Sequence, residues 1–187
     1  MLKEQGLIVE NLDGLLNAGL LTDVHFVVRG VKLAAHSQIV AASSPVLAEL
    51  FSWGIDQNAP KIVMVDNTRP DAFRHFLKYL YTGVLPELDR GMTVLLFVLA
   101  HQFQVDSLKT HCANCLGELV EMENIVATLY LSQIYSSQLL RQKTLRFIWQ
   151  HCTFEFFTRI NYIALIKRFP ALEDEVMGFL FTASNLN

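Results

Sequence analysis

The sequence predicts an α+β fold in which a small β-sheet comes early in the chain and helices make up most of the rest. Two short runs rich in β-branched residues, 24–28 and 31–35, are joined at Arg29-Gly30 as in a hairpin. A third run, KIVMVD at 61–66, is β-branched and almost wholly apolar, which is typical of another strand. From residue 121 onwards the hydrophobic periodicity is helical and no further strand is needed.

The hairpin has a predicted register. A two-residue turn at Arg29-Gly30 makes residues face each other when their numbers sum to 59. Gly30 supplies one positive φ angle, but a strict type I′ turn needs another at Arg29, so a longer or bulged turn remains an alternative. Because strand side chains alternate between faces, one face is wholly apolar and is predicted to be buried. This inner face consists of Val24, Phe26, Val28, Val31, Leu33 and Ala35.

The same register places Asp23 opposite His36 at the open end of the hairpin. The pair predicts either a buried or interfacial ion pair that holds this end closed, or a carboxylate that caps the following helix. A catalytic pair is not favoured, because Ser37 directly follows His36 and no GxSxG motif supplies a nucleophile.

The first 21 residues contain an apolar stripe with helical spacing. It predicts either a helix packed on its own domain or a helix covered by a second copy of the chain, and the pattern alone leaves both open. The stripe consists of Leu7, Ile8, Leu12, Leu15 and Leu16.

Helices are predicted to follow the hairpin in a regular succession. Pro45 sits at a favoured first helical position, with Ser43 or Ser44 as the preceding cap. In the loop 52–60, Trp53 and Ile55 either tuck inward or form an exposed anchor for a partner. Gly83 is predicted to end the helix that contains Phe73 and Phe76. The predicted helices cover 37–42, 45–51, 70–82, 91–103, 105–119, 122–135, 137–151, 154–159, 160–168 and 171–181.

Composition limits the classes of function. The 187 residues are 52% hydrophobic and 18% charged, so the chain has either a large core or an apolar surface reserved for a partner. The net charge of -3 does not indicate a nucleic-acid-binding protein. No apolar run is long enough to span a membrane. Three cysteines do not make a disulfide framework, which favours an intracellular, reducing compartment.

Cysteine and histidine residues gather in the helical part without the spacing of a metal site. Cys112 and Cys115 form a CxxC beside His111, with His151-Cys152 further on. Both groups lie inside helical patterns rather than on a knuckle turn, and the CxxC is not at a helix N-terminus that would lower a thiol pKa. We therefore interpret the thiols as structural, and we predict no catalytic residue, no metal and no cofactor.

The residues themselves resemble a known family. The segment that contains Asp23-Val24, Ala35-His36-Ser37 and Val40 through Leu47 resembles a BTB/POZ domain, and Phe73 through Gly83 is similar to that family's second signature block. The likeness extends over about residues 7–119. The later helices resemble the opening of a BACK domain. Within the family the sequence is most similar to the speckle-type POZ proteins, which join a MATH, a BTB and a short BACK domain.

This resemblance implies a BTB/POZ fold, with a small three-stranded sheet flanked by helices, followed by an all-helical partial BACK segment. It implies a BTB/POZ domain with its dimerisation helix over 1–119, a BACK-like segment over 120–182 and a frayed tail over 183–187. Such BTB domains form homodimers, so the resemblance favours the dimer interpretation of the N-terminal stripe. The implied dimer residues are Ile8, Leu12, Leu15, Leu16, Asp23 and His36, with Ile39 and Val40 as lesser candidates.

Speckle-type proteins also bind a cullin scaffold and act as substrate adaptors of cullin–RING ubiquitin ligases. Their cullin contact includes a hydrophobic-x-Glu motif, and the aligned residues here are Ile55, Asp56 and Gln57. Gln57 therefore replaces the glutamate, which removes a charge but keeps hydrogen-bonding capacity. Phe51 and Trp53 complete the candidate cullin surface.

The resemblance also leaves a second function open, an oligomerisation module of a transcription regulator without cullin binding. No MATH domain is present in these residues, so clients are expected to bind through a domain outside this chain or by other means. A nuclear or cytoplasmic location is implied, with the nucleus favoured. An aromatic that supports self-association in the short BACK domain is matched by Met177, which makes Val176, Met177 and Phe179 candidates for a second contact.

Overall fold

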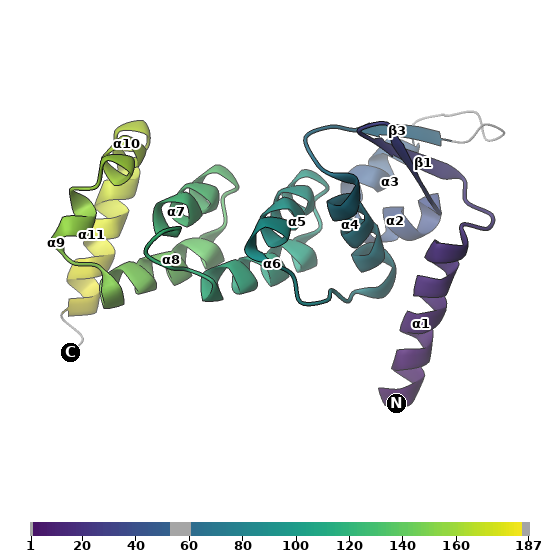
Figure 1. The fold of residues 1–187 in the computed structure, drawn as a ribbon, viewed down its shortest axis with the longest axis horizontal. Coiled ribbons are helices and arrows are strands. Elements are labelled where there is room, and N and C mark those ends of the chain that lie inside the picture. The colour runs from purple at the N-terminus through teal and green to yellow at the C-terminus, as the bar shows by residue number, and fades with distance from the viewer. Residues whose placement is uncertain (1, 53–60, 185–187) are drawn as a thin grey trace. The chain divides into compact units, whose positions relative to one another are not determined.

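The computed structural model describes residues 2–52 and 61–184, and the chain divides into two compact units, Met1–Cys112 and Ala113–Asn187. The division falls within helix α6 (Asp106–Glu118). Figure 1 shows the elements of each unit. Besides the start of α6, the first unit contains α1 (Leu2–Ala18), β1 (Val24–Val28), β2 (Val31–Ala35), α2 (Ser37–Ser43), α3 (Pro45–Ser52), β3 (Lys61–Val65), α4 (Pro70–Thr82) and α5 (Arg90–Gln102).

The hairpin forms in the predicted register. Val24 faces Ala35, Phe26 faces Leu33 and Val28 faces Val31, so each pair of numbers sums to 59. The turn has two residues, because Arg29 adopts a φ of 47° and Gly30 a φ of 81°. Five of the six predicted inner residues have no more than a tenth of their surface exposed, whereas Val31 beside the turn is exposed.

The third strand pairs with β1 and not with β2. It runs parallel to β1, so the sheet has the order β2-β1-β3 and both β2 and β3 are edge strands. The inner face packs on α4, where the rings of Phe26 and Phe73 lie 5.0 Å apart. Phe76 and Phe103 extend this aromatic cluster, with ring centroids 5.1 Å apart. The hairpin and the apolar face of α4 therefore form one core.

Most helix bounds agree with the predicted ranges to within a few residues. Gly83 follows α4 with a φ of 68° and donates its N–H to the Tyr79 carbonyl, as expected of a helix-ending glycine. Ser44 is the cap before α3, since its hydroxyl accepts the Leu47 N–H at 3.2 Å. The predicted helix over 154–159 is shorter than expected, because α9 covers only Phe154–Phe157.

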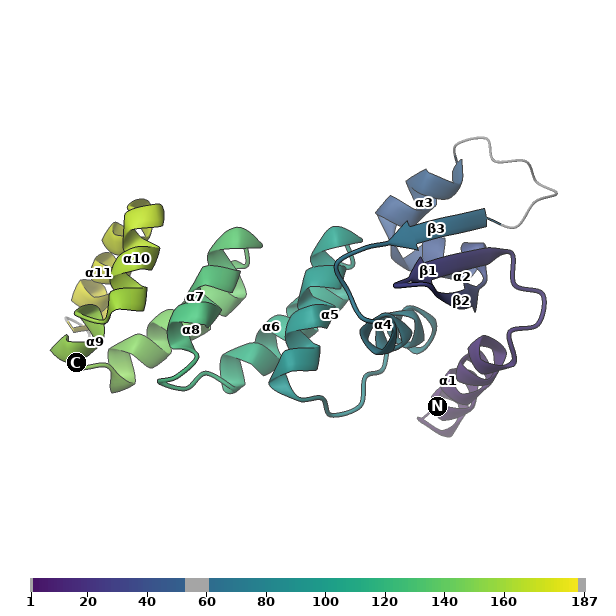
Figure 2. The ribbon, with the colours of Figure 1, turned by 45° about the horizontal axis from the view of Figure 1, so that its top comes forward.

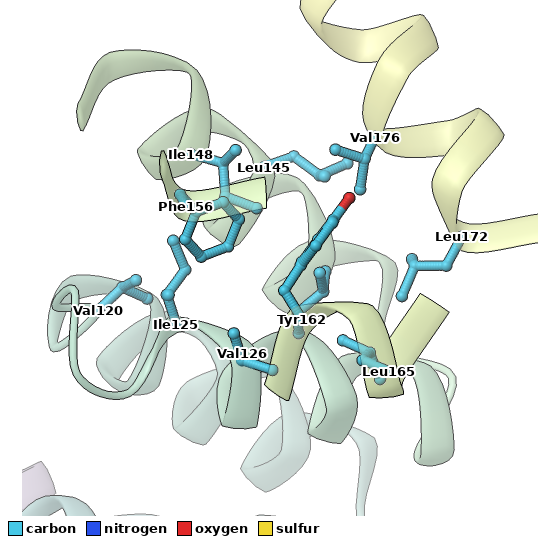
Figure 3. Close-up of a cluster of buried hydrophobic side chains, with 11 residues drawn as sticks. Val120, Ile125, Val126, Leu145, Ile148, Phe156, Tyr162, Leu165, Leu172 and Val176 are labelled. Carbon is cyan, nitrogen blue, oxygen red and sulfur yellow. The ribbon is translucent and has the colours of Figure 1, made fainter. Parts of the chain in front are cut away.

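The second unit is helical throughout its described residues. Its helices are the end of α6, then α7 (Ile125–Ile134), α8 (Gln138–His151), α9, α10 (Ile160–Arg168) and α11 (Ala171–Ser184). α7 begins later than predicted, because Asn124 accepts the Glu121 N–H and forms a turn there. Phe156 and Tyr162 lie at the centre of the core, with ring centroids 5.0 Å apart. Figure 3 shows their side chains among apolar residues from the surrounding helices.

Candidate interaction surfaces

One side of α1 is apolar and exposed. Leu7 and Ile8 have 58% and 59% of their surface accessible, and Leu15 has 37%. Leu15 follows Leu7 and Ile8 after about two helical turns, so the three side chains lie along one side of the helix. Leu20 and Leu21, directly after the helix, are exposed as well. A contiguous apolar stripe of this kind is typical of a surface that another protein covers.

A neighbouring face of α1 packs on its own unit. Leu12 and Leu16 are half-buried, and α1 packs against α4. Asp13 forms an ion pair with Lys78 of α4 at 3.0 Å. Both alternatives for the N-terminal stripe are therefore represented, because Leu12 and Leu16 lie against the same subunit while Ile8 and Leu15 point away from it.

At the open end of the hairpin, Asp23 caps α2. Its carboxylate accepts the Ser37 N–H at 2.7 Å and the Ser37 hydroxyl at 2.5 Å. Burial on its own would raise the pKa of Asp23, but these hydrogen bonds, together with the positive charge of Lys61, hold the pKa below the ordinary value. Of the two predicted roles, capping of the following helix is the one present in the subunit.

His36 does not bond to Asp23 but to Tyr81 and Leu20. The Tyr81 oxygen accepts the His36 backbone N–H at 2.8 Å and lies 2.7 Å from Nδ1. Nε2 lies 2.8 Å from the Leu20 carbonyl oxygen, which can only accept. In the neutral imidazole, Nε2 therefore carries the hydrogen and the Tyr81 hydroxyl donates to Nδ1. The imidazole ties the end of α4 to the segment that connects α1 to β1.

Sequence reasoning missed Tyr81 and Ser37 as members of this cluster. Ser37 directly follows His36, so its proximity was a usable signal. Tyr81 lies 45 residues away, and its place in the apolar stripe of α4 indicated packing rather than a hydrogen bond. Burial raises the pKa of Tyr81, and the hydroxyl stays a donor throughout the physiological range.

The two lesser dimer candidates on α2 have different environments. Ile39 is half-buried and keeps part of its side chain at the surface. Val40 is fully buried in the core of its own unit, so its side chain has no surface to offer a partner. We therefore leave Val40 out of the interface proposed below.

Only one of the five candidate cullin residues lies in the described part of the chain. Phe51, in α3, is half-buried and has the Lys61 ammonium 5.1 Å from its ring centroid. Trp53, Ile55, Asp56 and Gln57 lie outside the described residues.

In the second unit, the three candidates on α11 are not equivalent. Val176 is fully buried in the core, whereas Met177 has 44% of its surface exposed. Phe179 is half-buried and packs against the same core. Met177 is thus the member of this group that a partner can contact without unfolding the unit.

The cysteines are free thiols, and Cys112 is buried. Burial raises the pKa of Cys152, whose sulfur lies 3.9 Å from the Met122 sulfur. Within residues 2–52 and 61–184, no group of three or more His, Cys, Asp or Glu side chains is placed to hold a metal ion. None of the described helices is long and apolar enough to cross a membrane.

The chain is similar to several known proteins. Residues 12–120 match the family model of the BTB/POZ domain. The mouse (Mus musculus) "TD and POZ domain-containing protein 2" is 25% identical over 181 residues, which are 96% of this chain and 50% of that protein. The mouse "TD and POZ domain-containing protein 4" is 26% identical over 168 residues, covering 89% and 45%.

The chain spans about half the length of these curated relatives. Among solved structures, the BTB domain of zebrafish PATZ1 superposes with a TM-score of 0.53 at 23% identity. The match covers 63% of this chain and 95% of that domain, so it concerns the fold of a part of this chain.

Proposed function

Because this chain belongs to the BTB/POZ domain family, we propose that it is a homodimeric protein-interaction module that acts as a substrate adaptor of a cullin–RING ubiquitin ligase. The family fold is a module for self-association and for binding other proteins. The observation that supports a dimer here is the exposed apolar side of α1, formed by Leu7, Ile8 and Leu15. A second copy that covers this stripe would remove apolar surface from water.

The proposed interface also includes the open end of the hairpin. Leu20 is exposed, while its carbonyl accepts the His36 hydrogen bond and anchors the segment after α1. Asp23 and His36 then act as positioning residues, because Asp23 holds the start of α2 through Ser37 and His36 holds the segment after α1 through Leu20. Ile39 supplies the part of α2 that remains at the surface.

Substitution on α1 tests the dimer. We expect the chain to sediment as a dimer at tens of micromolar and the double variant Ile8→Asp/Leu15→Asp as a folded monomer, since two carboxylates cannot enter an apolar interface unpaired. Ile160→Asp, at an exposed isoleucine of the second unit, is the matched control and should leave the dimer intact. Leu12→Asp is less informative, because Leu12 is half-buried and its substitution also disturbs the subunit.

Dimerisation would help an adaptor by bringing two copies of each binding site together. Two copies present two cullin sites and two client sites, which raises the effective concentration of client near the ligase without any new contact. Clients are proposed to bind through a domain outside this chain. This function acts through binding alone, so the proposal assigns no catalytic residue and no cofactor.

The cullin contact has its own test at Gln57. We expect the wild-type chain to bind the N-terminal domain of a cullin in a pull-down at micromolar concentration, and Gln57→Glu to bind more tightly because it restores the acidic residue of the family motif. Gln57→Lys should bind more weakly, with the dimer unchanged. No binding by either the wild type or Gln57→Glu would contradict the adaptor role.

The glutamine is also what favours the alternative, an oligomerisation module of a transcription regulator that binds no cullin. A dimer without cullin binding would support it. We further propose that the helices over 120–182 form a partial BACK segment with a second self-association contact at Met177. Met177→Asp should then remove species larger than a dimer and leave the dimer itself unchanged in sedimentation.

A further inference from the structure

A groove runs along the edge of the sheet in the first unit. It lies between α1, β2 and α4 and has a volume of about 480 Å³. Figure 2 shows β2 as the strand on the side of the sheet toward α1 and α4. Leu16, Leu33 and Leu77 line the groove with apolar surface. The exposed side of α1 with Ile8 and Leu15 does not line it, so the groove is separate from the proposed dimer surface.

The edge strand β2 offers unpaired backbone groups to this groove. The two-residue turn makes Val28 and Val31 a hydrogen-bonded pair, and the even-numbered residues of β1 then bond to β2. The carbonyl of Asp23, directly before β1, accepts the Lys61 N–H, as expected if the odd-numbered carbonyls face β3, while the Asp23 N–H donates to the Ala35 carbonyl at the end of β2. On β2 the backbone N–H and C=O groups of Lys32 and Ala34 therefore point away from β1.

Lys32 and Ala34 both line the groove. Within the described part of the chain, no residue forms a hydrogen bond with these four backbone groups. An edge of this kind can accept an additional strand, because main-chain bonds supply affinity without requiring a particular sequence.

Positive charge remains unpaired along the groove. Lys78 is neutralised by Asp13 at 3.0 Å, and Asp71 by Arg69 at 3.0 Å. Lys32 and Arg74 line the groove, and among the residues that the structure describes neither has an ion-pair partner. The chain as a whole carries a net charge of -3, so this excess of positive charge is local. It complements an anionic ligand.

We propose that this groove binds an extended acidic peptide segment of a partner protein, which adds a strand to the free edge of β2. Side chains of an added strand alternate between two faces. One set would lie on the face toward α4 and cover the apolar surface of Leu16 and Leu77, while acidic side chains of the other set would lie on the outer face beside Lys32. Arg74 of α4 would add its attraction for the negative charge of the peptide as a whole. The backbone of the peptide would pair with the free groups of Lys32 and Ala34.

A peptide fits these features better than a nucleic acid does. Binding to a phosphate backbone draws on several cationic contacts, and this groove supplies two unpaired ones. Its remaining surface is apolar, and a strand edge matches the hydrogen-bonding pattern of a peptide but not of a sugar–phosphate chain. The binding of a nucleic acid is therefore an outcome that would count against the proposal.

The test uses labelled seven-residue peptides and the whole chain. The first peptide alternates glutamate and valine, the second alternates lysine and valine, and the third is the acidic peptide N-methylated at alternate residues to block strand pairing. In fluorescence anisotropy we expect the acidic peptide to bind at least about tenfold more tightly than either of the others. Its binding should weaken as salt is added, and the Lys32 and Ala34 amides should become protected from hydrogen exchange.

Protein variants locate the binding. Lys32→Glu/Arg74→Glu should weaken binding of the acidic peptide by about tenfold or more. Arg146→Glu/Lys167→Glu changes the same number of charges at exposed residues of the second unit and should bind normally. Ile8→Asp/Leu15→Asp should also bind the acidic peptide normally. The groove proposal can therefore fail while the dimer proposal stands, and the dimer proposal can fail while the groove proposal stands.

Four results would overturn the proposal. Equal binding of the N-methylated peptide would show charge attraction without strand pairing. Equal binding of the lysine peptide would remove the selectivity for an acidic segment. Tighter binding of a single-stranded oligonucleotide in competition would identify a nucleic-acid surface. A loss of self-association in Lys32→Glu/Arg74→Glu, seen by sedimentation, would assign the edge to a second copy of the chain. The peptide comparison on the wild-type chain remains decisive if a variant fails to fold.

Discussion

The two units of the chain hold their buried hydroxyl groups in different ways. In the first unit, the Ser44 hydroxyl donates to the Phe103 carbonyl, 59 residues later, and the Tyr81 hydroxyl bonds to His36, 45 residues earlier. In the second unit, the Ser132 and Thr144 hydroxyls donate to carbonyls three and four residues before them, within their own helices. The first unit thus has hydroxyls that join distant segments, beside local bonds such as that of Thr93 to the Asp89 carbonyl, whereas the Ser132 and Thr144 hydroxyls of the second unit bond locally.

This difference indicates what specifies each arrangement. Hydrogen bonds between distant segments accept only one relative placement of those segments, so they select a unique packing around the open end of the hairpin. Side chains bonded to their own helix give no such selection. The helices of the second unit are then placed mainly by the apolar cluster around Phe156 and Tyr162 shown in Figure 3. We therefore expect substitutions that leave a cavity to lower the stability of the second unit most. Substitutions that remove a hydroxyl should lower the stability of the first unit most.

The largest effect is expected from Phe156→Ala in the core of the second unit. Removing a fully buried ring should lower the free energy of unfolding of that unit by about 3–5 kcal/mol. The matched control is Phe154→Ala, because Phe154 lies two residues earlier and is 81% exposed, and its effect should stay within about 0.5 kcal/mol. Chemical denaturation followed by the fluorescence of Trp149 measures both, and equal effects would contradict a core centred on Phe156.

High pH should weaken the second unit through Tyr162. Burial, with the nearby charge of Glu173, raises the pKa of this buried tyrosine to about 12. The unfolded tyrosine ionises near its ordinary pKa of about 10, so stability present below pH 10 is lost as the pH rises toward 12. The loss amounts to about 2–3 kcal/mol, since each pKa unit corresponds to about 1.4 kcal/mol. Tyr162→Phe should flatten this part of the stability profile, and an unchanged profile would argue against the raised pKa.

Tyr81→Phe should cost the first unit about 1–2 kcal/mol, because it leaves the His36 N–H and Nδ1 without their partner. Tyr130→Phe is the matched change in the second unit. The Tyr130 ring packs against Phe169, and a loss of only a few tenths of a kcal/mol is expected there. Thermal unfolding measures the loss of stability in both variants. A larger loss for Tyr130→Phe than for Tyr81→Phe would contradict the expected difference between the units.

The smallest effect is expected at low pH, where Asp23 becomes protonated. The pKa of Asp23 is lowered in the folded chain, so its contribution to stability is present above the ordinary aspartate pKa and is lost as the pH falls through the lowered value. Ser37→Ala removes one of the bonds that lower this pKa and should shift the acid unfolding midpoint slightly upward. Thr182→Ala removes a hydroxyl bonded to carbonyls of its own helix and should leave the midpoint unchanged. Circular dichroism during acid titration measures both midpoints.

Local patterns were sufficient to predict much of the fold. The alternation of apolar residues and the position of Gly30 predicted the hairpin register, and the register is confirmed. The helix that ends at Gly83 was likewise predicted from neighbouring residues, and of the two predicted caps, Ser43 and Ser44, the structure has Ser44. The BTB/POZ family was predicted from two short blocks of residues and is confirmed over residues 12–120.

Other features depend on contacts between distant residues. The strand over 61–65 was predicted, but its parallel pairing with β1 was not, because a strand pattern does not name its neighbour. The N-terminal stripe was ambiguous for a similar reason. Helical spacing shows that Leu12 and Ile8 belong to an apolar stripe, and only the packing of α1 on α4 decides that Leu12 lies against the subunit while Ile8 stays exposed.

By itself, the sequence determined the strands, the hairpin register, the helices and the family, because each follows from the spacing of side chains a few residues apart. The tertiary structure alone decided the partners of Asp23 and His36, the strand order β2-β1-β3 and the groove along β2. These depend on which surfaces meet after the chain has folded back over tens of residues. Hydrogen bonds and packing at such distances leave no periodic signal in the sequence.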